Sequence, residues 1–141
     1  MSRFHPTALI FSGFFLLGIL IILWGVLLPD LTRSLQMSAA QSGWFFMVMA
    51  LGTISGAYLG GKYVQKFNFL KLFAALALAE TLLLLMISWV QTSTELMIGI
   101  FLFGLFCSVM FTIGHTLIAR LHANKRAQMM GLMDFMFSLG T

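Results

Sequence analysis

Residues 8–28 read ALIFSGFFLLGILIILWGVLL, a run of 21 residues without a charged side chain that ends at Pro29 and Asp30. A helix rises about 1.5 Å per residue, so this run can cross the roughly 30 Å apolar core of a bilayer. Arg3 and His5 precede it, as in a secretory signal peptide. However, it exceeds the about 7–15 apolar residues of a signal peptide, and no Ala-x-Ala cleavage pattern follows. The run is therefore predicted to be a retained membrane-spanning helix.

The rest of the chain repeats this pattern. Three further apolar runs have the length of a membrane span, namely residues 39–59, 72–90 and 96–118. Ser38 and Gln41 have the spacing of a capping box at the start of the first of these runs. A fifth apolar segment begins near residue 127 and covers only about 15 residues, too few to cross a bilayer. The sequence predicts an all-α integral membrane protein with four full transmembrane helices plus the start of a fifth.

Composition excludes several other classes of protein. Hydrophobic residues make up 60% of the 141 residues and charged residues only 9%, whereas a soluble domain carries about 25% charged residues. A soluble enzyme, a nucleic-acid-binding protein and a disordered tail are therefore excluded. The single cysteine, Cys107, lies inside an apolar run, so neither a disulfide framework nor a metal site is expected. We find no hydrolase or metalloprotease motif, and we expect neither catalytic residues nor a cofactor.

The basic residues predict the orientation of the chain. If the N-terminus is cytoplasmic, seven of the eight basic residues face the cytoplasm and only Arg33 faces outward. Such a bias is typical of a multi-pass protein with a cytoplasmic N-terminus, and we expect a bacterial inner membrane. The seven residues are Arg3, Lys62, Lys66, Lys71, Arg120, Lys125 and Arg126.

Small residues recur on two of the predicted helices. Gly52, Gly56 and Gly60 follow one another at intervals of four, a spacing that lets a second helix approach closely in lipid. In the run 96–118, small or polar residues also share one face. They are Gly104, Ser108, Thr112 and His115. Helix packing explains the glycines, whereas the hydroxyls and the imidazole could equally line a polar cavity, because they would be unsatisfied in lipid.

Three ionisable residues lie within apolar segments. Glu80 lies about 13 Å along its helix from Lys71, and Asp134 lies about 12 Å beyond Arg126. A charge in the bilayer core costs roughly 2.5–3.5 kcal/mol, so a functional role is the first hypothesis for Glu80, Asp134 and His115. Glu80 and Asp134 are our candidates for proton coupling. The alternatives are structural: a hydrogen bond from Glu80 to a neighbouring helix through Thr81 or Ser88, and for Asp134 a pair with a basic group or a helix cap.

Several of these segments resemble the major facilitator superfamily of secondary transporters. Residues 25–31 (GVLLPDL) and 37–43 (MSAAQSG) are similar to the passage between the first two helices of the family. Residues 56–66 (GAYLGGKYVQK) resemble its loop Gly-x-x-x-Asp-Arg-x-Gly-Arg-Arg, with Gly60 at the Asp position and Gly61 at the Arg position. Arg126 and Ala127 stand where the family often has Arg-Gly. Residues 112–116 (TIGHT) and 133–135 (MDF) are more similar to the fucose-permease-like and TsgA-like branch.

The resemblance implies a fragment of a longer transporter. The family unit has twelve helices in two halves, which alternately expose a central site to either side of the membrane. Residues 1–141 would be the incomplete N-terminal half, and the remaining C-terminal part would be its partner. By this implication Ser108, Thr112 and His115 are the candidates for the solute cavity. The expected function is secondary active transport of a small solute, sugar-like or another small organic molecule, by a permease with proton symport as one option.

Two other classes remain as alternatives. One is a complete four-helix membrane protein that acts as an oligomeric exporter. The other is a non-catalytic membrane scaffold, which the glycine-lined faces would suit. The partners expected in every case are the lipid bilayer and, for a transporter, a small solute and protons.

Overall fold

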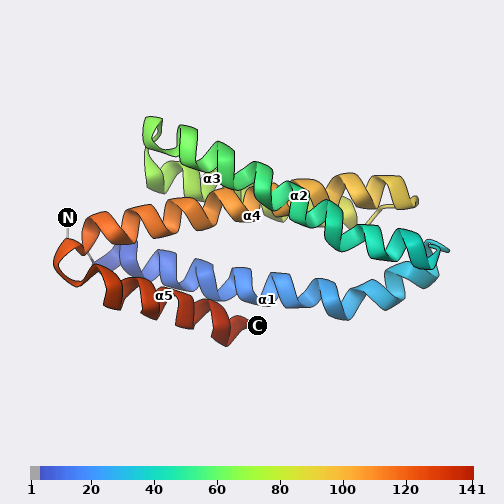
Figure 1. The fold of residues 1–141 in the computed structure, drawn as a ribbon, viewed down its shortest axis with the longest axis horizontal. Coiled ribbons are helices and arrows are strands. Elements are labelled where there is room, and N and C mark those ends of the chain that lie inside the picture. Colours follow the sequence, from blue (N-terminus) through green and yellow to red (C-terminus); the bar gives the residue numbers. More distant parts are fainter. Residues whose placement is uncertain (1–3) are drawn as a thin grey trace. The chain divides into compact units, whose positions relative to one another are not determined.

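The computed structural model describes residues 4–141 as a series of helices (Figure 1). In chain order they are α1 (Phe4–Ser34), α2 (Ala39–Tyr63), the 3-10 helix η1 (Val64–Lys66), α3 (Phe69–Ile87), α4 (Ser93–Leu121), the 3-10 helix η2 (Ala123–Lys125) and α5 (Arg126–Gly140). Helices α1 to α4 are each long and apolar enough to cross a membrane. The predicted all-α membrane fold is confirmed. Arg3, one of the residues used to predict the orientation, lies outside the described residues.

The helices extend beyond the predicted apolar runs. Pro29 does not end α1, which continues to Ser34. Proline removes one backbone hydrogen bond and crowds the carbonyl four residues earlier, but membrane helices tolerate it where the freed backbone groups find other partners. Helix α1 therefore extends beyond the apolar run that ends at Pro29.

The starts of α2 and α3 are determined by side-chain caps. Ser38 accepts a hydrogen bond from the Gln41 backbone N–H at 3.2 Å, and the Gln41 side chain accepts from the Ser38 N–H at 2.8 Å. The predicted capping box is therefore confirmed. Asn68 caps α3 through a bond from the Lys71 N–H at 3.2 Å, so α3 begins at Phe69 rather than at residue 72 and ends at Ile87.

Within the described residues the chain forms two compact units, residues 4–26 with 113–141 and residues 27–112. In the first, α5 runs beside the first part of α1 (Figure 1). The two backbones meet at Gly18 and Gly140, where an added methyl group on either glycine would collide with the other helix. The Thr7 hydroxyl and His122 Nε2 are hydrogen-bonded at 2.9 Å and join the start of α1 to the turn that follows α4.

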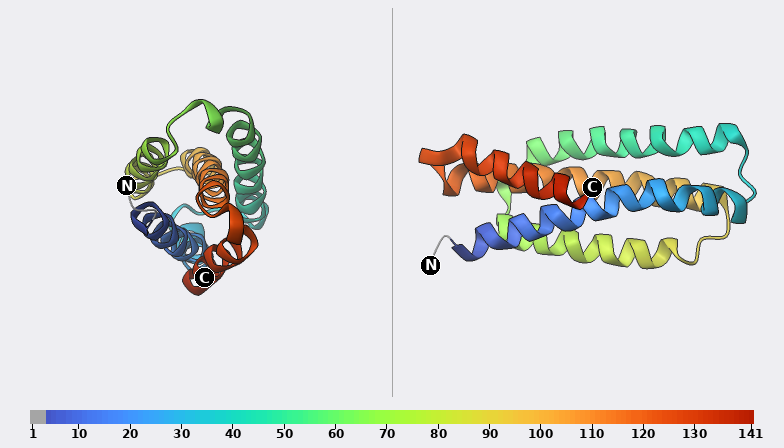
Figure 2. Two further views of the ribbon diagram at one scale, coloured as in Figure 1. Left: turned by 90° about the vertical axis from the view of Figure 1, so that its left-hand side faces the viewer. Right: turned by 90° about the horizontal axis from the view of Figure 1, so that it is seen from below.

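The second unit packs α2 and α3 against α4. Figure 2 shows α2 and α4 side by side, and their backbones approach where Gly52 faces Phe101 and where Gly104 faces Met49. Gly99 of α4 lies against the side chain of Ile87 on α3. The glycines thus allow the close approach that favours helix association when no hydrophobic effect operates between helices.

Candidate functional site

The candidate site is a pair of ionisable side chains within the first unit. His115 Nε2 on α4 lies 3.2 Å from Asp134 Oδ1 on α5. The structure thus joins one predicted cavity residue to one predicted proton-coupling residue.

The short connection between α4 and α5 explains why these two residues meet. Helix α4 ends at Leu121 and α5 begins at Arg126, with η2 between them, so the two helices form an antiparallel hairpin. His115 lies six residues before Leu121 and Asp134 eight residues after Arg126, or about 9 and 12 Å from the turn. The two side chains are therefore at similar depths on facing helices. Asp134 pairs with a basic group, which is one of its predicted structural alternatives.

An aromatic ring from α1 completes this site. The rings of Phe14 and His115 meet edge to face, with centroids 5.5 Å apart and an interplanar angle of 63°. Phe14 is fully buried, and Gly114 lies directly against its ring. Because Gly114 has no side chain, Phe14 can pack there and hold the imidazole from one side.

The pair is open on its other side. The side chains of His115 and Asp134 are 33% and 60% exposed, respectively. The imidazole can accept or donate a proton and the carboxylate can accept one, so the two groups can share a proton or form an ion pair. Within residues 4–141 no cluster of three or more His, Cys, Asp or Glu side chains has the arrangement of a metal site.

The other two predicted cavity residues face α2. Ser108 is 7% exposed and lies against Gly56. Thr112 lies against Gly60, and its hydroxyl donates to the Ser108 carbonyl at 3.0 Å. Both residues thus fill the space that the α2 glycines leave open. Their role in a solute cavity remains a prediction.

Glu80 belongs to the second unit and has a partner that the sequence did not indicate. Its side chain is 3% exposed, and its Oε1 accepts a hydrogen bond from the Cys107 thiol at 2.8 Å. Thr81 and Ser88, the expected partners, instead donate to backbone carbonyls of their own helix. Glu80 and Cys107 lie 27 residues apart on two different helices. Their spacing along the chain does not show which residues of α3 face which residues of α4.

Replacing Cys107 by alanine should lower the free energy of unfolding by about 1–3 kcal/mol, because it leaves the buried Glu80 carboxyl without its donor. Cys107→Ser replaces the thiol by a hydroxyl that can still donate to Glu80, so it should lower the free energy of unfolding clearly less. Both variants can be compared with the wild type by denaturant unfolding in detergent micelles. Equal losses in the two variants would show that the thiol acts only through its volume.

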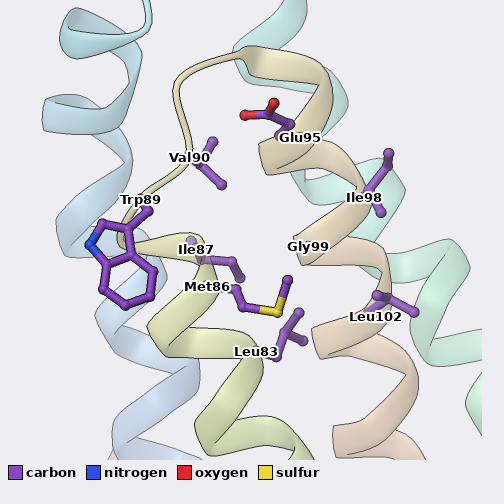
Figure 3. A pocket seen from close by; sticks show the side chains of 9 residues that line it. All are labelled: Leu83, Met86, Ile87, Trp89, Val90, Glu95, Ile98, Gly99 and Leu102. Atoms are coloured by element: carbon purple, nitrogen blue, oxygen red, sulfur yellow. The ribbon is translucent and has the colours of Figure 1, made fainter.

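A separate apolar groove of about 360 Å³ lies between the ends of α3 and α4 (Figure 3). Leu83 and Met86 line it from α3, and Ile98 and Leu102 from α4. The carboxylate at its edge, Glu95, accepts bonds from the Gln91 and Thr92 N–H groups and so caps α4. The groove therefore has few polar groups that could bind a solute, in contrast to the His115–Asp134 site.

The remaining predicted motif residues lie near helix ends. Lys62 is in the last turn of α2, Lys66 is in η1, and Arg126 begins α5. Both lysines lie over tyrosine rings: Lys62 over Tyr58 and Tyr63, and Lys66 over Tyr63.

The four membrane-length helices, with an ionisable pair between α4 and α5, define a multi-pass membrane protein. Comparison with known protein families identifies its family. The family model described as Major Facilitator Superfamily matches residues 9–141. The chain belongs to this superfamily, and the resemblance seen in its sequence is confirmed.

Two mammalian transporters match most of the chain. Human sodium-dependent glucose transporter 1 is 27% identical over 129 residues, which cover 92% of this chain and 25% of the relative. Mouse sodium-dependent glucose transporter 1A is 28% identical over 130 residues, covering 92% of this chain and 31% of the relative. The chain therefore spans between a quarter and a third of the length of these relatives. No solved structure gives a significant match.

Proposed function

We propose that the protein is a secondary active transporter that moves a small, sugar-like solute across the membrane by alternating access. The observation that carries this proposal is the His115–Asp134 pair, which is polar, partly exposed and placed in apolar helices of a superfamily member. Polar side chains inside a membrane protein are costly and usually mark the path of a solute or ion. The proposal includes a cytoplasmic N-terminus in a bacterial inner membrane.

The chemistry of the site suits a polyhydroxylated solute. The imidazole can donate hydrogen bonds to hydroxyls or accept them, and the carboxylate can accept them. The neighbouring Phe14 ring supplies an apolar surface. The two relatives are described as glucose transporters, which favours a hexose-like substrate. Ser108 and Thr112 remain proposed members of the cavity.

We propose a proton as the coupling ion. Hard cations prefer several oxygen ligands, often including backbone carbonyls freed by a broken helix. Here α4 and α5 are continuous around His115 and Asp134, and the pair offers one carboxylate with an imidazole. This arrangement can hold a proton between its two groups. The relatives are described as sodium-dependent, so the experiment must compare both ions.

The test is uptake of radiolabelled hexoses into proteoliposomes that contain the protein as its gene encodes it. Vesicles would carry an inward proton gradient, an inward sodium gradient or no gradient, with glucose, galactose and a deoxyhexose as solutes. We expect accumulation with the proton gradient. Accumulation only with sodium would overturn the coupling proposal. If no solute moved under any gradient, the scaffold alternative would replace transport.

A further inference from the structure

A cluster of two lysines and two tyrosines lies at the end of α2 and in η1. Lys62 Nζ lies 5.7 Å from the ring centroid of Tyr58 and 5.3 Å from that of Tyr63. Lys66 Nζ lies 5.2 Å from the same Tyr63 ring. Two ammonium groups therefore converge on one aromatic ring. We call Tyr58, Lys62, Tyr63 and Lys66 the lysine–tyrosine cluster.

Within the described part of the chain, no ion pair joins Lys62 or Lys66 to an acidic residue. Residues 56–71 contain three lysines and no Asp or Glu. Three of the four acidic residues have other partners: Asp134 pairs with His115, Glu80 is bonded to Cys107, and Glu95 caps α4. The dipole at the end of α2 favours a cation and accounts for the position of Lys62. It does not account for the second ammonium on the same ring, which brings two positive charges to one cluster.

An anion bound at the cluster would offset these two positive charges. The cluster lies at the end of a helical segment long and apolar enough to span a membrane, so we expect it at the level of the lipid headgroups, where tyrosine rings are also favoured. A lipid phosphate there can accept charge-assisted hydrogen bonds from both lysines. We propose that the lysine–tyrosine cluster binds the phosphate of an anionic phospholipid.

Neighbouring apolar side chains favour a lipid over a soluble phosphate. Leu59 and Phe67 flank the cluster and are 38% and 57% exposed, and Tyr58 is 66% exposed. An acyl chain attached to the bound headgroup would cover these surfaces, whereas inorganic phosphate would leave them exposed. This proposal involves neither His115 nor Asp134, so it does not depend on the transport proposal.

The experiment is native mass spectrometry of the purified protein in detergent, titrated with dioleoyl-phosphatidylglycerol or dioleoyl-phosphatidylcholine. These lipids have the same acyl chains and differ in net charge. The test variant is Lys62→Gln/Lys66→Gln. The control Arg33→Gln/Lys125→Gln removes the same charge from exposed positions elsewhere. We expect wild type to prefer phosphatidylglycerol, the test variant to bind it roughly thirty-fold more weakly, and the control to change by less than about threefold.

Several results would overturn the proposal. One is equal retention of the two lipids by the wild type, a comparison that needs no variant. Another is unchanged phosphatidylglycerol binding by the Lys62→Gln/Lys66→Gln variant, or an equal loss in the control. A third is displacement of bound phosphatidylglycerol by an equal concentration of inorganic phosphate, which would identify a site for soluble anions instead.

Discussion

Replacing Gly56 by alanine is expected to lower the free energy of unfolding by about 2 kcal/mol or more. A methyl group at this position would overlap the carbonyl oxygen of Leu105 on α4 and lie 2.9 Å from Cβ of Ser108. The oxygen belongs to a helix backbone and cannot rotate away as a flexible side chain can. The helices must therefore separate, which also weakens the contacts of Gly52 and Gly60 along the same face.

Gly43 provides a matched control on the same helix. It lies near the start of α2, is exposed, and would have no heavy atom within 4 Å of an added methyl group. Alanine has a higher helix propensity than glycine, so Gly43→Ala should leave stability unchanged or raise it by up to about 1 kcal/mol. Denaturant unfolding in detergent micelles, followed by circular dichroism, measures both variants. If Gly56→Ala were as stable as Gly43→Ala, α2 and α4 would not be packed as described.

The helices were predictable because their signals are local. Apolar runs of membrane length identified four spans, and the Ser38–Gln41 spacing identified the start of α2. The helix ends were less predictable. Pro29 is a strong signal for a helix end in water, but here α1 continues beyond it to Ser34. The outcome depends on partners that the freed backbone groups find in three dimensions, which the local sequence does not contain.

The candidate site was predictable in part. His115 and Asp134 were each identifiable, because an ionisable group in an apolar segment is rare. Their pairing could have been inferred as well, since they lie at similar distances from the α4–α5 turn. The bond between Glu80 and Cys107 could not, because it depends on how α3 and α4 are rotated about their axes. Distances along the chain do not determine that rotation.

Replacing Asp134 by asparagine is expected to abolish proton-driven accumulation while solute exchange continues. For one coupled proton, a pH difference of one unit supports an accumulation ratio of about ten. Asparagine has the size of aspartate and can still form a hydrogen bond with His115, but it cannot take up a proton in this range. The accumulation ratio should therefore fall from about ten to about one. Counterflow exchange without a gradient should persist, because solute binding and alternating access do not require net proton transfer.

Glu95→Gln is the matched control for this measurement. It makes the same chemical change at an acid that caps α4 through the Gln91 and Thr92 N–H groups, and its amide oxygen can still accept those bonds. Accumulation by this variant should match the wild type.

His115→Ala should resemble Asp134→Asn if the pair acts as one unit, because the carboxylate loses the group 3.2 Å away with which it shares the proton. If Asp134→Asn kept a ratio near ten, proton coupling through this pair would be wrong, while the membership of the superfamily would stand. Loss of both accumulation and exchange would instead show that solute binding itself requires the carboxylate charge, because exchange requires a bound solute but no driving ion.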